Sequence, residues 1–269
     1  MGVWEYGGVG VSYPLTPTLP YPQTMTMRCY IQPEHWARDE VTLSPEESHH
    51  LLHVLRAGAG TRVGIFNGRG GVGAAEVTSA ESSRAILRVV ERSQEAAPRV
   101  RLVLIQAVLR EQKMDLVVQK AAELGAAEVI PVVAERSVVR LKSRQFGERR
   151  ERWERIALGA AKQSGVAWLP AIESPRPLAD VLASPPPCDL FLVGALDEPA
   201  RPLRDVLAEA KARTVRAIAA LIGPEGDFSP AEMAAIRAAG AVAASFGGSV
   251  LRSETAAIFA LGALRYEML

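Results

Sequence analysis

Along residues 101–269, short apolar segments typical of strands alternate with amphipathic segments typical of helices. The pattern predicts strands at 102–108, 129–133, 190–193 and 217–222, and helices at 111–124, 148–163 and 203–212. Alternation of this kind favours parallel strands joined by helical crossovers, with helices covering both faces of the sheet. We therefore expect an α/β domain with a mostly parallel sheet in this part of the chain.

Two apolar runs in this domain end in glycine-bearing loops. The first loop contains Gly223-Pro224-Glu225-Gly226, and the second contains Phe246-Gly247-Gly248. Glycine allows positive φ and a close approach of the backbone to a ligand, and ligands gather at strand ends in open α/β sheets. The two loops thus predict a small-molecule site built largely from backbone.

Both loops lead into helices whose first residues can be recognised. Ser229, Pro230 and Glu232 form the pattern of a capping box with proline at the first helical position. Ser253 is the expected N-cap of the last helix, with Glu254 in its first turn and Arg252 just outside it. The sequence therefore places charged residues where a glycine loop meets a helix.

The N-terminal part has a different rhythm. Strand-like segments at 62–66, 74–78 and 85–90 are separated by turn residues, with Asn67-Gly68 suited to a hairpin tip. One helix, capped by Ser44, is expected to run to Arg56. These features predict a small β-barrel with one helix, followed by a linker at 97–100. Residues 1–26 contain no Lys or Arg, and we interpret them as a disordered extension or a misassigned start.

The motifs resemble those of the RsmE group of SPOUT-class RNA methyltransferases. The resemblance runs in order from about Met27 to the C-terminus and is carried by these stretches: His50-Leu51, Val54-Leu55-Arg56, Phe66-Asn67-Gly68, Lys113-Met114-Asp115, 119–125, 160–165, 221–227 and 246–256. Three positions depart from the family's pattern. Asp227 stands where a second glycine is usual, and Val166 and Ser249 stand where arginine is common.

The resemblance implies a PUA-like RNA-binding β-barrel at 27–96 and a SPOUT methyltransferase domain at 101–269, whose mostly parallel sheet carries a trefoil knot. It also implies a homodimer formed through the C-terminal domain. The last helix agrees with a dimer, because residues 256–264 leave it no polar face. The alternative for this helix is burial within one subunit.

The implied activity is methylation, with S-adenosylmethionine as cofactor, of N3 of a specific uridine, position 1498, in the 16S rRNA of the small ribosomal subunit. Either naked 16S rRNA or the assembled small subunit is the expected partner. Arg252 is the candidate cation that stabilises negative charge on the uracil ring. Glu254 is a candidate proton acceptor or an orienting partner of Arg252, and the residues leave both roles open.

Two further sets of site residues are expected. The cofactor-binding set occupies the strand ends and glycine loops: Gly194, Ala195, Leu221, Ile222, Gly223, Pro224, Glu225, Gly226, Phe246, Gly247, Gly248, Val250, Leu251, Thr255 and Ala256. The RNA-binding set consists of basic residues and one histidine: Arg28, His50, Arg56, Arg110, Lys113, Arg136, Arg140 and Lys142.

Composition and motifs exclude several other classes. A net charge of +1 gives no global attraction to nucleic acid, so RNA must meet a local basic patch. Cys29 and Cys188 form no disulfide framework or zinc motif, and with no apolar run long enough for a membrane span they favour a cytoplasmic protein. His49, His50 and His53 lack the carboxylate or cysteine that would complete a metal site.

Two alternative functions are open at this point. The first is a non-catalytic RNA-binding protein with a degenerate cofactor domain, which the three departures from the family pattern keep in play. The second is a Rossmann oxidoreductase, for which residues 68–73 match GxGxxG. We expect a strand rather than a helix to follow those glycines, which argues against a dinucleotide site.

Overall fold

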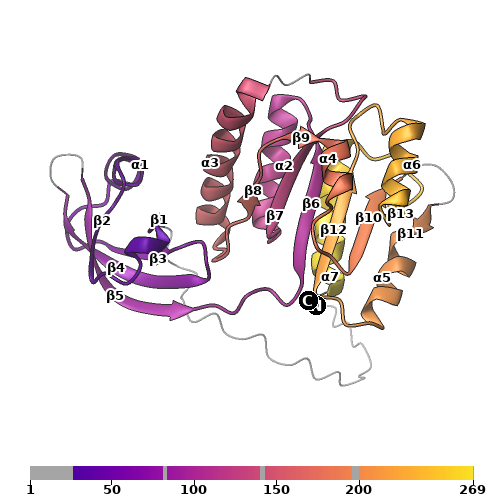
Figure 1. The fold of residues 1–269 in the computed structure, drawn as a ribbon. Helices are drawn as coiled ribbons and strands as arrows, with labels where there is room; N and C mark the ends of the chain where they lie inside the picture. The colour runs from indigo at the N-terminus through magenta and orange to yellow at the C-terminus, as the bar shows by residue number, and fades with distance from the viewer. Residues whose placement is uncertain (1–26, 81–83, 140–142, 196–199, 269) are drawn as a thin grey trace, which may run out of the picture.

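The N-terminal domain of the computed structural model is a five-stranded sheet (Figure 1). The structure describes residues 27–80, 84–139, 143–195 and 200–268. The strands follow the order β1-β3-β4-β5-β2, and all pairs are antiparallel except β1 with β3. Their bounds are β1 Arg28–Tyr30, β2 Glu40–Thr42, β3 Arg62–Phe66, β4 Gly71–Ser79 and β5 Ile86–Gln94. β1 and β2 lie at opposite edges, with no pairing between them among the described residues, so the sheet is not closed by backbone hydrogen bonds into the expected barrel.

Local signals set the turns of this domain. Asn67 Oδ1 accepts hydrogen bonds from the backbone N–H groups of Arg69 and Gly71, which fixes the tip of the β3–β4 hairpin. The GxGxxG stretch therefore runs from a hairpin into β4, and the dinucleotide interpretation is wrong. Ser44 caps α1 (Pro45–His49) as expected, but the helix continues only as a π-helical turn over His50–Val54. Arg56 has φ +56° and lies beyond the helix.

The C-terminal domain contains an eight-stranded sheet in which every pairing is parallel. The strand order is β11-β13-β10-β12-β6-β7-β8, and β9 also pairs with β7. The strands are β6 Arg101–Ala107, β7 Glu128–Val133, β8 Ala171–Ile172, β9 Arg176–Pro177, β10 Leu190–Gly194, β11 Arg201–Pro202, β12 Ala217–Ile222 and β13 Val242–Ser245. The prediction of a mostly parallel sheet is confirmed.

Helices cover both faces of this sheet, as Figure 1 shows. The helices are α2 Glu111–Glu123, α3 Phe146–Ser164, α4 Leu178–Ala183, α5 Leu203–Lys211, α6 Pro230–Ala238 and α7 Ser253–Met268, and short 3₁₀ turns span Pro33–His35 and Ser143–Gln145. Strand residues alternate between faces, so Leu104 packs beneath α2 and α7 whereas Ile105 packs in the core that includes α4 and α6. Both residues are fully buried, which explains the continuous apolar runs of the sequence.

Helix α7 packs against α2, β6 and β12 and buries Ala257, Ala260 and Leu264. Its other face remains accessible within one chain: Phe259 is 44% exposed and Tyr266 is 82% exposed. The expectation that every side of this helix is buried does not hold within one chain. Phe259 contacts the ring of Phe246, with centroids 5.6 Å apart, but it and Tyr266 remain accessible on this side of the helix.

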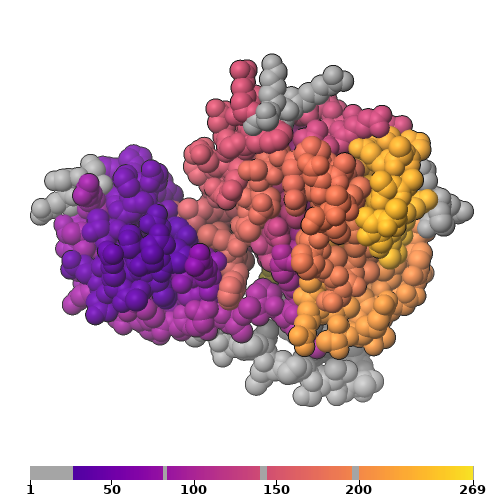
Figure 2. Space-filling model, in the orientation of Figure 1, coloured from indigo at the N-terminus to yellow at the C-terminus, as the bar shows by residue number. Residues whose placement is uncertain are grey.

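The two domains meet through the end of α3 and the segment after it. Gly70 N–H donates to Ala167 C=O, and Leu169 N–H donates to Gly68 C=O, so the β3–β4 hairpin tip is bonded to this segment. Lys162 of α3 forms an ion pair with Glu47, which is largely buried. Figure 2 shows the N-terminal domain, in indigo and violet, as a separate lobe beside the larger domain.

Candidate active site

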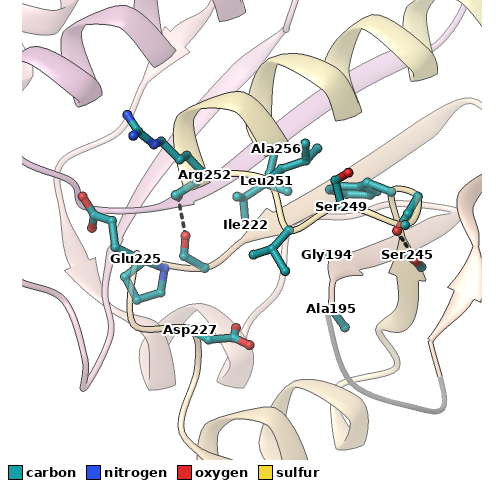
Figure 3. Close-up of a pocket in the computed structure, with 17 residues that line it drawn as sticks. Gly194, Ala195, Ile222, Glu225, Asp227, Ser245, Ser249, Leu251, Arg252 and Ala256 are labelled. Carbon is teal, nitrogen blue, oxygen red and sulfur yellow. Dashed lines mark hydrogen bonds between the residues drawn. The ribbon is translucent and has the colours of Figure 1, made fainter.

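Three neighbouring strands, β13, β10 and β12, end at the same edge of the C-terminal sheet. The end of β10, the loops after β12 and β13 and the start of α7 enclose a cavity of about 350 Å³ (Figure 3). Its lining residues are Gly194, Ala195, Ile222, Gly223, Pro224, Glu225, Asp227, Ser245, Phe246, Gly247, Gly248, Ser249, Val250, Leu251, Arg252, Ser253 and Ala256. The volume falls within the range of small-molecule sites.

Most of the residues expected to bind a cofactor line this cavity, and three do not. Leu221 is fully buried and faces the core on the α4 and α6 side of the sheet. Gly226 lies against Arg136, and Thr255 points to the exposed side of α7. Leu221 fails because consecutive strand residues face opposite sides of a sheet, so only one of Leu221 and Ile222 can face the cavity.

The glycines keep the cavity open. A Cβ atom on Gly194 would lie 3.0 Å from the ring of Phe246, and one on Gly223 would lie 3.2 Å from the ring of Phe228. Gly247 has φ +121°, a conformation that other residues rarely adopt. Side chains at these positions would displace the aromatic rings or strain the loop, so the predicted role of the glycines has a physical basis.

A buried polar chain joins the first glycine loop to α7. Ser253 Oγ donates a hydrogen bond to Gly223 C=O, and Gln106 Nε2, at the end of β6, donates to Ser253 Oγ at 3.0 Å. Gln106 is completely buried. Sequence reasoning missed Gln106, because a single glutamine at the end of an apolar strand carries no motif.

The same contacts correct the expected start of α7. Ala256 N–H donates to Arg252 C=O at 2.8 Å, so the backbone of Arg252 begins the helical ladder and Ser253 is already in the helix. The expectation that Ser253 is the N-cap is wrong, because its hydroxyl is used between the loop and β6. Arg252 stands at the helix N-terminus, where exposed N–H groups attract anions.

Charged side chains gather at one side of the cavity. Lys113 Nζ lies 2.9 Å from Glu225 Oε1 and 3.4 Å from Glu254 Oε2. The hydrogen bond to Glu225 raises the pKa of Lys113. Partial burial acts to raise the pKa of Glu225, but the hydrogen bond from Lys113 and nearby positive charge outweigh it, and the pKa is lowered. Both groups are therefore held in their charged forms.

Arg252 and Glu254 differ in their surroundings. The guanidinium of Arg252 is exposed and makes no hydrogen bond or ion pair with any residue in the described ranges. Glu254 is only 9% exposed, and its Oε2 accepts no hydrogen bond there apart from the ion-pair contact with Lys113. A free cation thus stands at the cavity beside a buried carboxylate whose main partner is a lysine.

The predicted RNA-binding residues that the structure describes lie near the first glycine loop, in the N-terminal domain and at the junction between the domains. Arg110 and Lys113 are at the start of α2, and Arg136 donates to Gly226 C=O at 3.2 Å, so these three surround the first glycine loop. The exposed Arg56 and the half-buried His50 lie in or just beyond the π-helical turn of the N-terminal domain. Arg140 and Lys142 lie outside the described residues.

Arg28 occupies the junction between the domains. Its Nη1 donates to Ala161 C=O at 3.1 Å and Val166 C=O at 3.4 Å, and the guanidinium lies 4.4 Å from the centroid of the Phe66 ring. Burial lowers the pKa of Arg28, opposed by the charge of Glu95. In this structure Arg28 joins the two domains, and its contact with RNA stays a prediction.

The residues that the structure describes also bear on metal binding and on membrane insertion. No group of three or more His, Cys, Asp or Glu side chains in those ranges is arranged to hold a metal ion. His49 and His53 instead stack with ring centroids 5.0 Å apart. None of the described helices is both long and apolar enough to cross a membrane.

Comparison with known families gives two matches along the chain. Residues 95–265 match an RNA methyltransferase domain, and residues 43–90 match an RNA methyltransferase PUA domain. Ribosomal RNA small subunit methyltransferase E from Mycobacterium bovis is 31% identical over 229 residues, covering 81% of this chain and 83% of the relative. The protein of that name from Bacillus subtilis is 27% identical, covering 84% and 90%.

The fold of the chain is similar to those of solved methyltransferase structures. Ribosomal RNA small subunit methyltransferase E from Neisseria gonorrhoeae, bound to S-adenosylmethionine, has a TM-score of 0.78 and 27% identity, with 89% of this chain and 97% of the other covered. A methyltransferase candidate from Legionella pneumophila, also with S-adenosylmethionine bound, has a TM-score of 0.82 and 29% identity, with 90% and 97% covered.

Proposed function

Because the chain belongs to the ribosomal RNA small subunit methyltransferase E family, we propose that it transfers a methyl group from S-adenosylmethionine to 16S rRNA. The more specific proposal is methylation of N3 of one uridine, position 1498. The single observation that carries this function is the glycine-lined cavity at the ends of β13, β10 and β12, closed by the N-terminus of α7.

The residues of the cavity suit this cofactor. Side chains at Gly194 and Gly223 would displace Phe246 and Phe228, and Gly247 has open space beside it, so the bare backbone at these positions suits a close ligand. Ile222, Leu251 and Ala256 offer apolar contact to an adenine ring. When bound, S-adenosylmethionine would supply an electrophilic methyl carbon. In-line attack by a nitrogen would form the N–CH3 bond as the S–CH3 bond breaks, and the sulfur would leave as the neutral thioether of S-adenosylhomocysteine.

Arg252 is the residue we assign to the uracil. N3 of uracil attacks only after its proton is lost, and the resulting negative charge spreads over the two ring oxygens. The exposed guanidinium of Arg252 stands at the N-terminus of α7, so its charge and the backbone N–H groups act on an anion in the same direction. Stabilising this anion raises the fraction of uracil that carries a free N3 lone pair.

Glu254 has two possible roles in the proposed reaction. Its buried carboxylate can accept the N3 proton. Alternatively, it can pair with Lys113 and, by its negative charge, help to orient the guanidinium of Arg252. Lys113 Nζ lies 3.4 Å from Glu254 Oε2, so removal of the carboxylate also removes this ion pair. Kinetics of Glu254→Gln across pH distinguishes the roles, because only loss of a proton acceptor changes the shape of the pH profile.

We assign RNA contact to the N-terminal PUA-like domain together with Arg110, Lys113 and Arg136 near the mouth of the cavity. A trefoil knot in the C-terminal sheet is also proposed, supported by the position of β10 between β12 and β13. The exposed Phe259 and Tyr266 on the apolar helix α7 support a homodimer through this domain.

Calorimetric titration with S-adenosylmethionine tests the proposed site. The wild-type protein is expected to bind one molecule per chain, and Gly223→Val is expected to abolish binding, because its side chain would enter the space held by Phe228 and Asp227. Gly58→Val is the matched control, since no atom lies within 4 Å of a Cβ at Gly58. Absence of heat for the wild type, with rRNA binding retained, would instead support a non-catalytic RNA-binding protein.

A further inference from the structure

Asp227 has a backbone conformation that is unusual for its residue type. Its φ is +57°, and among the described residues only one other non-glycine residue, Arg56, has a positive φ. Aspartate tolerates this left-handed region better than most residues do, but glycine adopts it more easily. Asp227 closes the turn of the first glycine loop, where its N–H donates to Pro224 C=O at 3.0 Å.

The two carboxylate oxygens of Asp227 have different surroundings. Oδ1 accepts a hydrogen bond from Phe228 N–H at 2.8 Å and lies 3.3 Å from the position of a Cβ on Gly223. Oδ2 makes no hydrogen bond or ion pair with the parts of the chain that the structure describes. The local backbone therefore holds the carboxylate against the cavity wall and leaves one oxygen free.

Asp227 differs in this respect from Glu225, the other carboxylate that lines the cavity. Glu225 is paired with Lys113, so its charge is already compensated. Asp227 has no cationic partner among the described residues, and Figure 3 shows its carboxylate directed away from Arg252, toward the side where Gly194 and Ala195 lie. Of the two carboxylates in the described cavity wall, Asp227 is thus the one with no cation paired to it, and its Oδ2 is available to a ligand.

The distribution of groups along the cavity indicates which part of a ligand meets Asp227. One side carries Arg252 and Glu225 and suits the reacting methyl group and its RNA acceptor. The opposite side is formed by Gly194, Phe246 and glycine-loop backbone and suits a flat base. In an adenosyl ligand the ribose lies between these parts, and carboxylates commonly accept hydrogen bonds from ribose hydroxyls.

On these grounds we propose that Asp227 is a specificity-determining residue that accepts hydrogen bonds from the ribose hydroxyls of the bound nucleoside. The inference rests on the proposed function, because it requires an adenosyl cofactor in this cavity. It assigns a ligand contact to a side chain at a position where a glycine could form the same turn without any side chain.

Binding measurements on two variants test this inference. Asp227→Gly keeps the turn and removes the carboxylate, and Asp227→Asn keeps the acceptor for Phe228 N–H but replaces the free oxygen by an amide nitrogen. Both variants are expected to bind S-adenosylmethionine, S-adenosylhomocysteine and 5′-methylthioadenosine about tenfold more weakly than the wild type, as loss of a charged hydrogen bond predicts. Asp39→Asn, an equal charge change on an exposed side chain of the other domain, is expected to leave all three affinities unchanged.

Four other outcomes of these binding measurements would contradict the proposed contact between Asp227 and the ribose or one of its premises. Unchanged affinities in both variants overturn the contact, while wild-type binding leaves the proposed function standing. A loss in Asp227→Gly alone assigns the effect to the loop backbone and overturns the role of the carboxylate. A loss for the two amino-acid-bearing ligands without a loss for 5′-methylthioadenosine overturns the ribose assignment. No binding by the wild type removes the proposed function itself. Thermal unfolding of each variant checks that the fold is intact.

Discussion

Replacement of Ser253 by alanine tests the link between the first glycine loop and α7. The Ser253 hydroxyl donates to Gly223 C=O and accepts from Gln106 Nε2; Ser253 and Gln106 are buried, whereas Gly223 is partly exposed at the cavity. Ser253→Ala removes both bonds while adding no volume. Gly223 C=O would be left without its side-chain partner, whereas Gln106 Nε2 keeps a hydrogen bond to Ala107 C=O at 3.0 Å.

The expected cost follows from these two losses. Each lost hydrogen bond costs about 0.5–1.5 kcal/mol, so the free energy of unfolding should fall by about 1–3 kcal/mol. For a chain of this size each kcal/mol lowers the melting temperature by about 2–4 °C, which gives a decrease of about 2–12 °C. Cofactor binding should weaken as well, because Gly223 loses its anchor.

Differential scanning calorimetry with and without S-adenosylmethionine measures both effects. Ser164→Ala is the matched control: its hydroxyl donates to Ala160 C=O within one helix, so its loss should cost less than about 0.5 kcal/mol. A Ser253→Ala protein as stable as the control, with unchanged affinity, would refute the claim that this hydroxyl holds the loop against the helix.

Three further predictions concern other parts of the molecule. Arg252→Ala should lower the rate of methyl transfer by about 10²–10³, the range for loss of one anion-stabilising group, while changing cofactor affinity much less; single-turnover kinetics and calorimetry separate the two. Lys162→Met should lower the free energy of unfolding, measured by urea denaturation, by about 3 kcal/mol, because Glu47 would remain as a buried charge. Lys211→Met removes one member of an exposed ion pair and should cost less than about 1 kcal/mol. Equal costs would contradict the interdomain role of the Lys162–Glu47 pair. Burial and the nearby charge of Glu47 raise the pKa of Cys29 from 9.0 to about 12. The stability that the neutral thiol contributes is therefore present below pH 9.0 and is lost as the pH rises toward about 12. Alkylation of Cys29 at pH 9 that is as fast in the native protein as in the urea-unfolded chain would contradict this prediction.

Much of the fold was predictable because its signals are local. The capping box at Ser229 is present, with Ser229 Oγ accepting from Glu232 N–H and the Glu232 carboxylate accepting from Ser229 N–H. Glu232 also accepts from Glu135 N–H at 2.8 Å, which ties the segment after β7 to α6, and this contact could not be predicted because it joins residues far apart in sequence. Short elements such as α4, β8 and β11 were missed, since they contain too few residues to show a period.

The candidate site likewise has features that the sequence predicts and features that depend on tertiary contacts. Glycine loops after apolar runs predicted the position of the cavity, but the side chains that complete it depend on tertiary contacts. Ser253 looks like a helix cap in the sequence and is used as a bridge in the structure. Arg28 looks like a basic RNA contact and is used between the domains. In both cases the residue type predicted that the side chain would form hydrogen bonds but did not predict which residues it would bond to.

Methyl transfer to small ribosomal subunits from a strain that lacks this modification measures the proposed activity itself. Labelled S-adenosylmethionine, followed by mass spectrometry of the rRNA nucleosides, identifies both the transfer and the modified atom. We expect one methyl group per subunit, present as 3-methyluridine, and transfer about 10²–10³ slower with Arg252→Ala. No transfer by a wild-type protein that binds the cofactor, or a methyl group on another atom, would contradict it.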